Sequence, residues 1–140
     1  MMQTHVLAAV KSFLLAARTR PIADLLSETD EFEKLIRSRS RARVCEHLAL
    51  MRQTRVRIAL LANAPVSDCI PLVEQFLLDP GTSTLRVLSL VGAFAVYCEE
   101  QGMDDVGAKF LRKAINRGQV ERDGLSQALQ VCERNLNRMG

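Results

Sequence analysis

The chain has 140 residues, about the size of one domain, and we expect a single domain over residues 1–140. Hydrophobic residues make up 48% and charged residues 25%, which is enough apolar material for a core without disulfides or metals. The net charge of +3 is too small to imply a nucleic-acid or membrane partner by itself. Few aromatic residues (4%), glycines and prolines disfavour a β-sandwich or barrel, so the composition predicts an all-α protein.

The longest uncharged stretches, residues 58–67 and 87–98, are too short to span a bilayer. The first twenty residues lack the basic-then-apolar order of a signal peptide, and we expect a cytoplasmic protein without a transmembrane anchor. The four cysteines are widely spread and form no CxxC pair. Each lies in an apolar run, so we expect reduced thiols that act as small hydrophobic residues.

The first half of the chain shows helical periodicity. Apolar residues recur every three or four positions in a first helix over about 3–18. Pro21 suits the first turn of a second helix, which carries apolar residues as far as Ile36. The polar stretch 38–43 predicts a loop, and a third helix is expected over about 44–61.

In the second half, Pro65 ends the third helix, and Ser67 or Asp68 is expected to cap a fourth. That helix should stop at 79–81. A fifth helix is predicted over about 84–101, with Thr82 or Ser83 as its cap and Gly102 at its end.

The last two helices are less regular. A sixth is predicted over about 104–116, broken at Arg117 and Gly118. Asp123 is the expected N-cap of the seventh, which carries Leu125, Leu129 and Leu136.

The fifth predicted helix has an unusual composition. Residues 87–98 read VLSLVGAFAVYC, which is apolar on all sides of a helix. Such a helix belongs in the middle of a domain. We therefore expect about seven helices, with the helix over about 84–101 at the centre of the bundle.

Catalysis and cofactor binding find little support. The two histidines, His5 and His47, are far apart, and neither lies at metal-ligand spacing from a cysteine or carboxylate. Cys45 and His47 cannot form a dyad, because residues two apart on a helix do not share a face. No phosphate-binding glycine motif is present. The sequence predicts a protein that is not an enzyme and has no metal or other cofactor.

Residues 37–57 contain seven arginines against one acid, Glu46. Such a run can contact phosphates, but it has no interleaved aromatic residues. We favour a solvated loop and helix face, and expect no nucleic-acid partner.

A helical-repeat interpretation is the alternative for the fifth and sixth helices. Seven positions roughly fit one tetratricopeptide hairpin: Phe94, Ala95, Cys98, Gly102, Gly107, Leu111 and Ala114. A single repeat cannot bury its own face, and no second copy is visible. This pattern indicates an antiparallel helix pair and leaves open a generic helical adaptor or chaperone.

Several segments, in collinear order, resemble the Bcl-2 family. Residues 72–79 (LVEQFLLD), a short turn and then 86–90 (RVLSL) resemble the BH1 region, with Arg86 at the place of the family's arginine. Residues 25–33 (LLSETDEFE) resemble a BH3 motif, and 121–125 (ERDGL) the start of BH2. Two tryptophans that the family places in these motifs are absent. The short link at 19–20 and the missing anchor are more similar to Bcl-2 homologues of large DNA viruses.

The resemblance implies a Bcl-2-like bundle whose surface groove binds an amphipathic BH3 helix of a pro-apoptotic protein. Six residues would line that groove: Phe32, Ile36, Leu72, Phe76, Leu88 and Ser89. Arg86 would pair with the aspartate of the ligand. The implied activity is anti-apoptotic sequestration in the cytoplasm of a host cell, with association to the mitochondrial outer membrane through partners. An exposed groove or the arginine-rich helix would also allow a homodimer.

Overall fold

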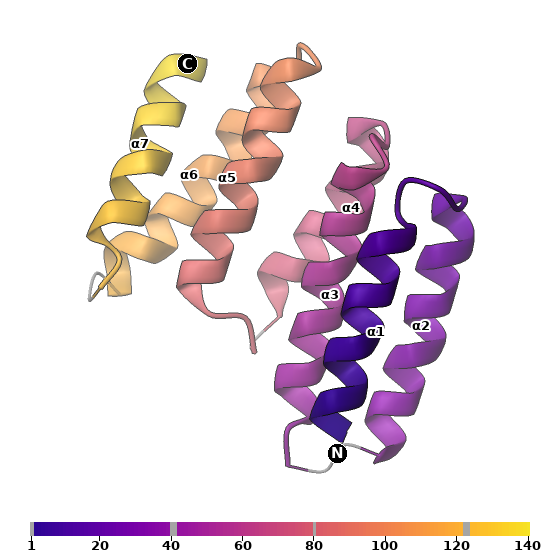
Figure 1. The fold of residues 1–140 in the computed structure, drawn as a ribbon. Coiled ribbons are helices and arrows are strands. Elements are labelled where there is room, and N and C mark those ends of the chain that lie inside the picture. The colour runs from indigo at the N-terminus through magenta and orange to yellow at the C-terminus, as the bar shows by residue number, and fades with distance from the viewer. Residues whose placement is uncertain (1, 40–41, 80, 122–123) are drawn as a thin grey trace. The chain divides into compact units, whose positions relative to one another are not determined.

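The computed structural model describes residues 2–39, 42–79, 81–121 and 124–140, and for residues 2 and 3 the backbone alone. These residues form seven helices and no strand, which confirms an all-α protein. The chain divides into two compact units, residues 1–82 and 83–140. The helices of the first unit are α1 (Met2–Ala16), α2 (Ile22–Arg39), α3 (Val44–Leu61) and α4 (Val66–Leu78). Those of the second are α5 (Thr84–Glu100), α6 (Asp104–Glu121) and α7 (Ser126–Met139) (Figure 1).

Helix α3 is the centre of the first unit, where it packs against α1, α2 and α4. One apolar cluster joins α1, α2 and α3 through Val6, Ile36 and Met51, which are all fully buried. The rings of Phe13 and Phe32 meet edge to face, with centroids 6.3 Å apart. The amphipathic faces that the periodicity predicted therefore face one another in this unit.

Charged side chains also enter the interior of the first unit. Arg52 of α3 forms an ion pair with Asp79, whose side chain is 2% exposed, and lies 3.9 Å from the buried carboxylate of Glu33 on α2. Arg55, one turn later, contacts Asp30 at 3.2 Å and the side-chain oxygen of Gln75 at 2.8 Å. The expectation of a solvated arginine face is wrong for Arg52 and Arg55, because they bind carboxylates of α2 and of Asp79, directly after α4, and an amide of α4.

Asp79 also organises the turn that follows α4. Its Oδ1 accepts a hydrogen bond from the backbone N–H of Gly81 at 2.8 Å, and its backbone oxygen accepts one from Thr82 at 3.2 Å. A Cβ on Gly81 would lie 2.7 Å from the backbone oxygen of Cys45, so only glycine fits there.

The second unit is an antiparallel hairpin of α5 and α6 with α7 packed against both helices (Figure 1). The hairpin closes at Gly102, which has φ +75° and follows the end of α5 as predicted. The rings of Phe94 and Phe110 meet edge to face at 5.4 Å. A Cβ on Gly107 would lie 3.0 Å from the backbone oxygen of Ala95, so glycine lets α5 and α6 approach closely.

Several predicted helix ends need correction. Pro65, rather than Ser67 or Asp68, occupies the N-cap position of α4, and both polar residues lie inside the first turn. Helix α6 does not break at Gly118 but continues to Glu121, because the buried Gly118 makes room for the side chain of Leu129. The polar stretch 38–43 is helical as far as residue 39.

Two predictions concern the N-caps of the fifth and seventh helices. Ser83 caps α5 as predicted, with its hydroxyl accepting from the N–H of Arg86 at 3.3 Å. Asp123 lies outside the described residues, and the described α7 starts after Leu125.

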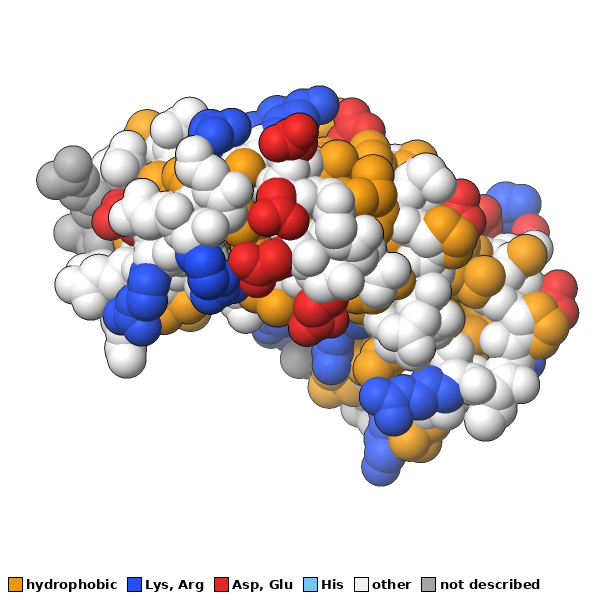
Figure 2. Space-filling model, turned by 90° about the horizontal axis from the view of Figure 1, so that it is seen from above, with side chains coloured by type: hydrophobic (Ala, Val, Ile, Leu, Met, Phe, Trp, Pro, Cys, Tyr) orange, Lys and Arg blue, Asp and Glu red, His pale blue; other side chains and the backbone are white. Residues whose placement is uncertain are grey.

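Helix α5 is not covered on every side, in contrast to the expectation from its apolar sequence. Leu85 is 53% exposed, and Ser89 and Ala93 are exposed on the same face. Large apolar side chains also reach the surface elsewhere, as the space-filling view illustrates (Figure 2). Within the described residues, none of the helices is both long and apolar enough to cross a membrane.

The cysteines follow the prediction with one exception. All four thiols are free, and Cys69, Cys98 and Cys132 are buried like small hydrophobic residues. Cys45 is exposed, because the first turn of α3 places it on the outer face while His47, two positions later, is buried.

Candidate binding groove between helices α5 and α7

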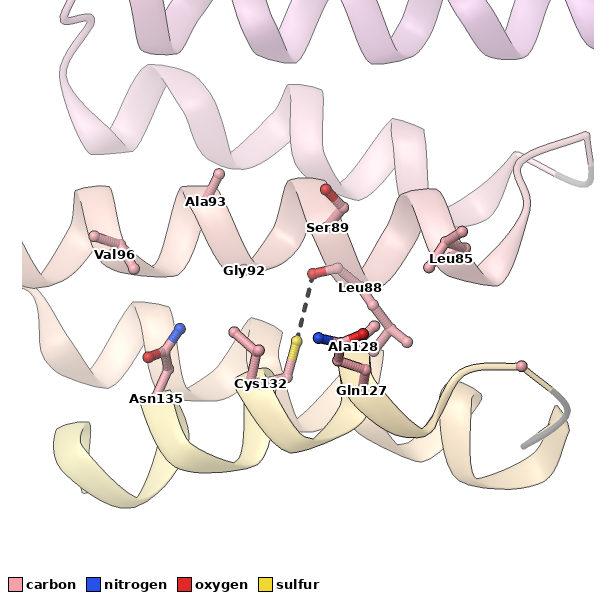
Figure 3. Close-up of a pocket in the computed structure, with 12 residues that line it drawn as sticks. Leu85, Leu88, Ser89, Gly92, Ala93, Val96, Gln127, Ala128, Cys132 and Asn135 are labelled. Atoms are coloured by element: carbon pink, nitrogen blue, oxygen red, sulfur yellow. Dashed lines mark hydrogen bonds between the residues drawn. The ribbon is translucent and has the colours of Figure 1, made fainter.

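A groove of about 540 Å³ runs between α5 and α7 in the second unit (Figure 3). This volume lies within the range of ordinary ligand sites, roughly 300–1,000 Å³. The residues that line it come from α5, from α7 and from the turn before α7: Leu85, Leu88, Ser89, Gly92, Ala93, Val96, Gly124, Gln127, Ala128, Val131, Cys132 and Asn135.

The spacing of small and apolar residues forms the groove. Along α7, Gln127, Val131 and Asn135 follow one another at four-residue intervals and so share one face. At the floor, a Cβ on Gly92 would lie 3.7 Å from the sulfur of Cys132, an ordinary van der Waals contact. Cys132 Sγ donates a hydrogen bond to the backbone oxygen of Leu88 at 3.4 Å, which joins the two helices (Figure 3).

Helices α5 and α7 run in the same direction, with α6 antiparallel to both (Figure 1). Beyond the C-terminal end of the groove, Arg138 of α7 donates to Glu99 of α5 at 2.7 and 2.9 Å and to Asn135 Oδ1 at 3.2 Å. The hydrogen bond from Arg138 lowers the pKa of Glu99. At the opposite end lie the N-termini of both helices, and neither helix has an acidic residue in its first turn.

The lining residues are chemically neutral. None of the twelve is Asp, Glu, Lys, Arg or His, although such charged residues are common elsewhere in the chain. Burial raises the pKa of the Cys132 thiol, which keeps it protonated at neutral pH. In the part of the chain that the structure describes, no group of three or more His, Cys, Asp and Glu could hold a metal ion. The groove therefore offers apolar surface together with hydroxyl and amide groups, which can bind a ligand through apolar contacts and hydrogen bonds.

Two of the seven predicted site residues, Leu88 and Ser89, lie together in this groove. Arg86 is exposed in the first turn of α5, on the same helix.

The other four predicted site residues belong to the first unit. Ile36 and Phe76 are fully buried, and Leu72 is 8% exposed. Phe32 is half-buried and packs against the cluster of α1, α2 and α3. Within their own unit, these four side chains contribute mainly to the core.

The contribution of α7 to the groove was not predicted from the sequence. Gln127, Val131 and Asn135 supply one side of the groove, but their sequence reads as an ordinary amphipathic helix. One signal was present, since Val131 interrupts the polar face of that helix and is 47% exposed.

Comparisons of the chain with protein-family models, with curated proteins and with solved structures found no match. They assign no family to the chain. The groove and the residues around it are therefore the basis for proposing a function.

Proposed function

We propose that the chain is a protein-interaction module, rather than an enzyme, and that the α5–α7 groove binds an apolar segment of a partner protein. One observation carries this proposal: an uncharged groove of about 540 Å³ with Leu85 and Val131 about half exposed at its edges. Removing such apolar surface from water stabilises a complex by about 25 cal/mol per Å² before the costs of association.

The helical-adaptor interpretation is the form of this proposal that the geometry supports best. Five of the tetratricopeptide-like positions are buried where α5 and α6 pack together: Phe94, Ala95, Cys98, Leu111 and Ala114. Gly107 allows the close approach of the two helices, and Gly102 supplies the turn. Because α7 packs against both helices of the hairpin, the hairpin has a third helix to cover it.

Binding of BH3 motifs is the second candidate, favoured by the position of Leu88 and Ser89 in the groove and of Arg86 at the surface of the same helix. In this form the protein is an anti-apoptotic, virus-type Bcl-2 homologue. It would have a Bcl-2-like fold and sequester pro-apoptotic partners in the cytoplasm or at the mitochondrial outer membrane. The resemblance also implies Phe32, Ile36, Leu72 and Phe76 as BH3-binding residues, although within the first unit these side chains contribute to the core.

The groove itself is tested by selecting peptides from a displayed random library against the full chain. We expect peptides that bind the wild type and fail to bind Val131→Glu, which adds a charge to the groove. Gln130→Glu is the matched control, because it adds the same charge to an exposed α7 position outside the lining. Circular dichroism checks that both variants fold. If no peptide distinguishes the two variants, the proposal is wrong.

The BH3 candidate is tested by calorimetric titration of BH3 peptides against wild type and Arg86→Ala. Deleting one member of a desolvated ion pair typically costs about 2–5 kcal/mol, so Arg86→Ala should weaken binding by about 30-fold or more. If Arg86→Ala binds BH3 peptides as tightly as the wild type, Arg86 does not have the assigned role. No binding of any BH3 peptide removes this candidate and leaves the adaptor interpretation.

A further inference from the structure

We propose that Glu33 is a proton-controlled latch for the C-terminal part of α2, residues 32–39. This segment packs on α3 while the Glu33 carboxyl is protonated, and it opens more often once that carboxyl is ionised. The latch belongs to the first unit and does not depend on the α5–α7 groove. Three features carry the proposal: the burial of Glu33, an oxygen without a donor, and two nearby arginines that other groups already hold.

The Glu33 carboxyl is buried without a hydrogen bond at one of its oxygens. Its side chain is 8% exposed, on a helix that packs against α3. Oε1 has no hydrogen-bond partner among the described residues, and Arg52 Nε, at 3.9 Å, is too far away to donate one. An ionised carboxylate that loses its water without gaining a donor is costly, whereas the neutral acid is easier to bury. Burial accordingly raises the pKa of Glu33.

Both arginines near Glu33 are held by other carboxylates. Arg52 donates to Asp79, and Arg55 lies 3.2 Å from Asp30. Two cations therefore serve three carboxylates in this cluster. Movement of Arg52 toward Glu33 would leave Asp79 unpaired, although the side chain of Asp79 is only 2% exposed. An ionised Glu33 thus gains a close cation only if another buried carboxylate loses one.

The other charged groups around α2 do not supply the missing donor. Arg37, on α2 itself, lowers the pKa of Glu33, but burial raises that pKa by more. The titratable residues of α1 are His5 and Lys11, and both are exposed. His47 is a second buried titratable side chain on α3, so the experiment has to distinguish it from Glu33.

The opening segment carries apolar side chains as well as Glu33. Ile36 is fully buried in the cluster that joins α1, α2 and α3, and Phe32 packs against the same cluster. Earlier in α2, Leu25 is buried in a separate cluster and holds that part of the helix. Opening of residues 32–39 returns Glu33 to water, where the ionised form is favoured. Loss of the proton therefore promotes a local opening that uncovers apolar surface.

Hydrogen exchange of the full chain at about pH 4.5 and about pH 7.5, corrected for the intrinsic pH dependence of amide exchange, tests the latch. We expect residues 32–39 to open about 3-fold or more often at the higher pH, because the carboxyl is then ionised. Glu33→Gln stays neutral and retains His47, and it should remove this difference. Glu31→Gln is the matched control, since Glu31 is an exposed residue of the same helix that pairs with Lys34. It should keep the difference.

A carbon-13 NMR titration of the Glu33 carboxyl in the wild type gives a second measurement that needs no variant. Titration above the ordinary range of glutamate supports the latch. Titration at or below that range overturns it, because Arg52 would then bind the ionised carboxylate. A pH difference that persists in Glu33→Gln also overturns the proposal and points to another group such as His47. An equal change in opening throughout the first unit would show that no local latch exists.

Discussion

The two units bury different kinds of side chain. The first encloses charged side chains, with Arg52 between Glu33 and Asp79, whereas the second carries the Glu99–Arg138 ion pair at its surface. The core of the second unit is built largely from apolar side chains that let helices approach at small residues such as Gly107. Buried charges restrict which partners a helix accepts, while small residues determine how closely helices pack.

The largest expected effect comes from breaking the buried ion network of the first unit. Arg52→Met leaves the carboxylates of Glu33 and Asp79 without their shared cation, and should lower the free energy of unfolding by about 3–5 kcal/mol. Urea unfolding followed by circular dichroism measures this loss. Arg57→Met, on the exposed face of the same helix, is the matched control and should cost little. Equal losses in the two variants would show that the network contributes no special stability.

The close packing of the second unit is tested at two glycines that both lie inside helices. Gly107→Ala places a Cβ against the backbone of Ala95 and should destabilise by about 1–2 kcal/mol. Gly92→Ala meets only the sulfur of Cys132 at an ordinary contact distance, and should gain about 0.5–1 kcal/mol from its better helix propensity. Thermal unfolding of both variants measures the difference. A stabilising Gly107→Ala would contradict the close approach of α5 and α6.

A smaller effect is expected from the pH dependence of the first unit. Burial raises the pKa of Glu33, whose Oε1 has no hydrogen-bond partner among the described residues. The folded state therefore favours the protonated carboxyl, and the contribution of this group to stability decreases as the pH rises through its raised pKa. Relative to Glu33→Gln, the wild type should gain stability as the pH falls from 7 toward about 4.5. Urea titrations of the wild type and of Glu33→Gln at both pH values measure this change. A stability difference between the two proteins that does not vary with pH would contradict the prediction.

The smallest effect concerns the Glu99–Arg138 ion pair at the surface of the second unit. Here the stability is expected to change with pH in the opposite direction from that at Glu33. The hydrogen bond from Arg138 lowers the pKa of Glu99, so this carboxylate stabilises the folded state above its ordinary pKa. That contribution should disappear as the pH falls through the lowered value. Relative to Glu99→Gln, the wild type should therefore lose stability on acidification. Since Glu99 is at the surface, added salt should weaken the effect, which a pair of titrations at low and high salt would measure.

Periodicity alone predicted much of the helical layout, because local spacing of apolar residues determines which face a helix buries. The third helix was predicted at 44–61 and lies at Val44–Leu61. Gly118 shows where local pattern is insufficient. A glycine inside a polar stretch looks like a helix end, but here it is the point where Leu129 of another helix packs against α6.

The groove could be predicted only in part. Leu88 and Ser89 were identified through a family resemblance, while Gln127 and Asn135 were not. Their role depends on α5 and α7 lying parallel and adjacent, although they are separated in the chain by α6. Long-range neighbours of this kind leave no local signal. The burial of Glu33 was missed for the same reason, since its partner Arg52 comes from another helix.

The placement of the thiols gives each unit its own reporter of opening rates. An alkylating reagent reacts with the thiolate, so the exposed Cys45 should be modified first. Burial raises the pKa of Cys69 to about 11, and also raises the pKa of Cys132. These two thiols become reactive when their surroundings open to water. The modification rate of Cys69 therefore follows transient opening in the first unit, and that of Cys132 follows the separation of α7 from α5.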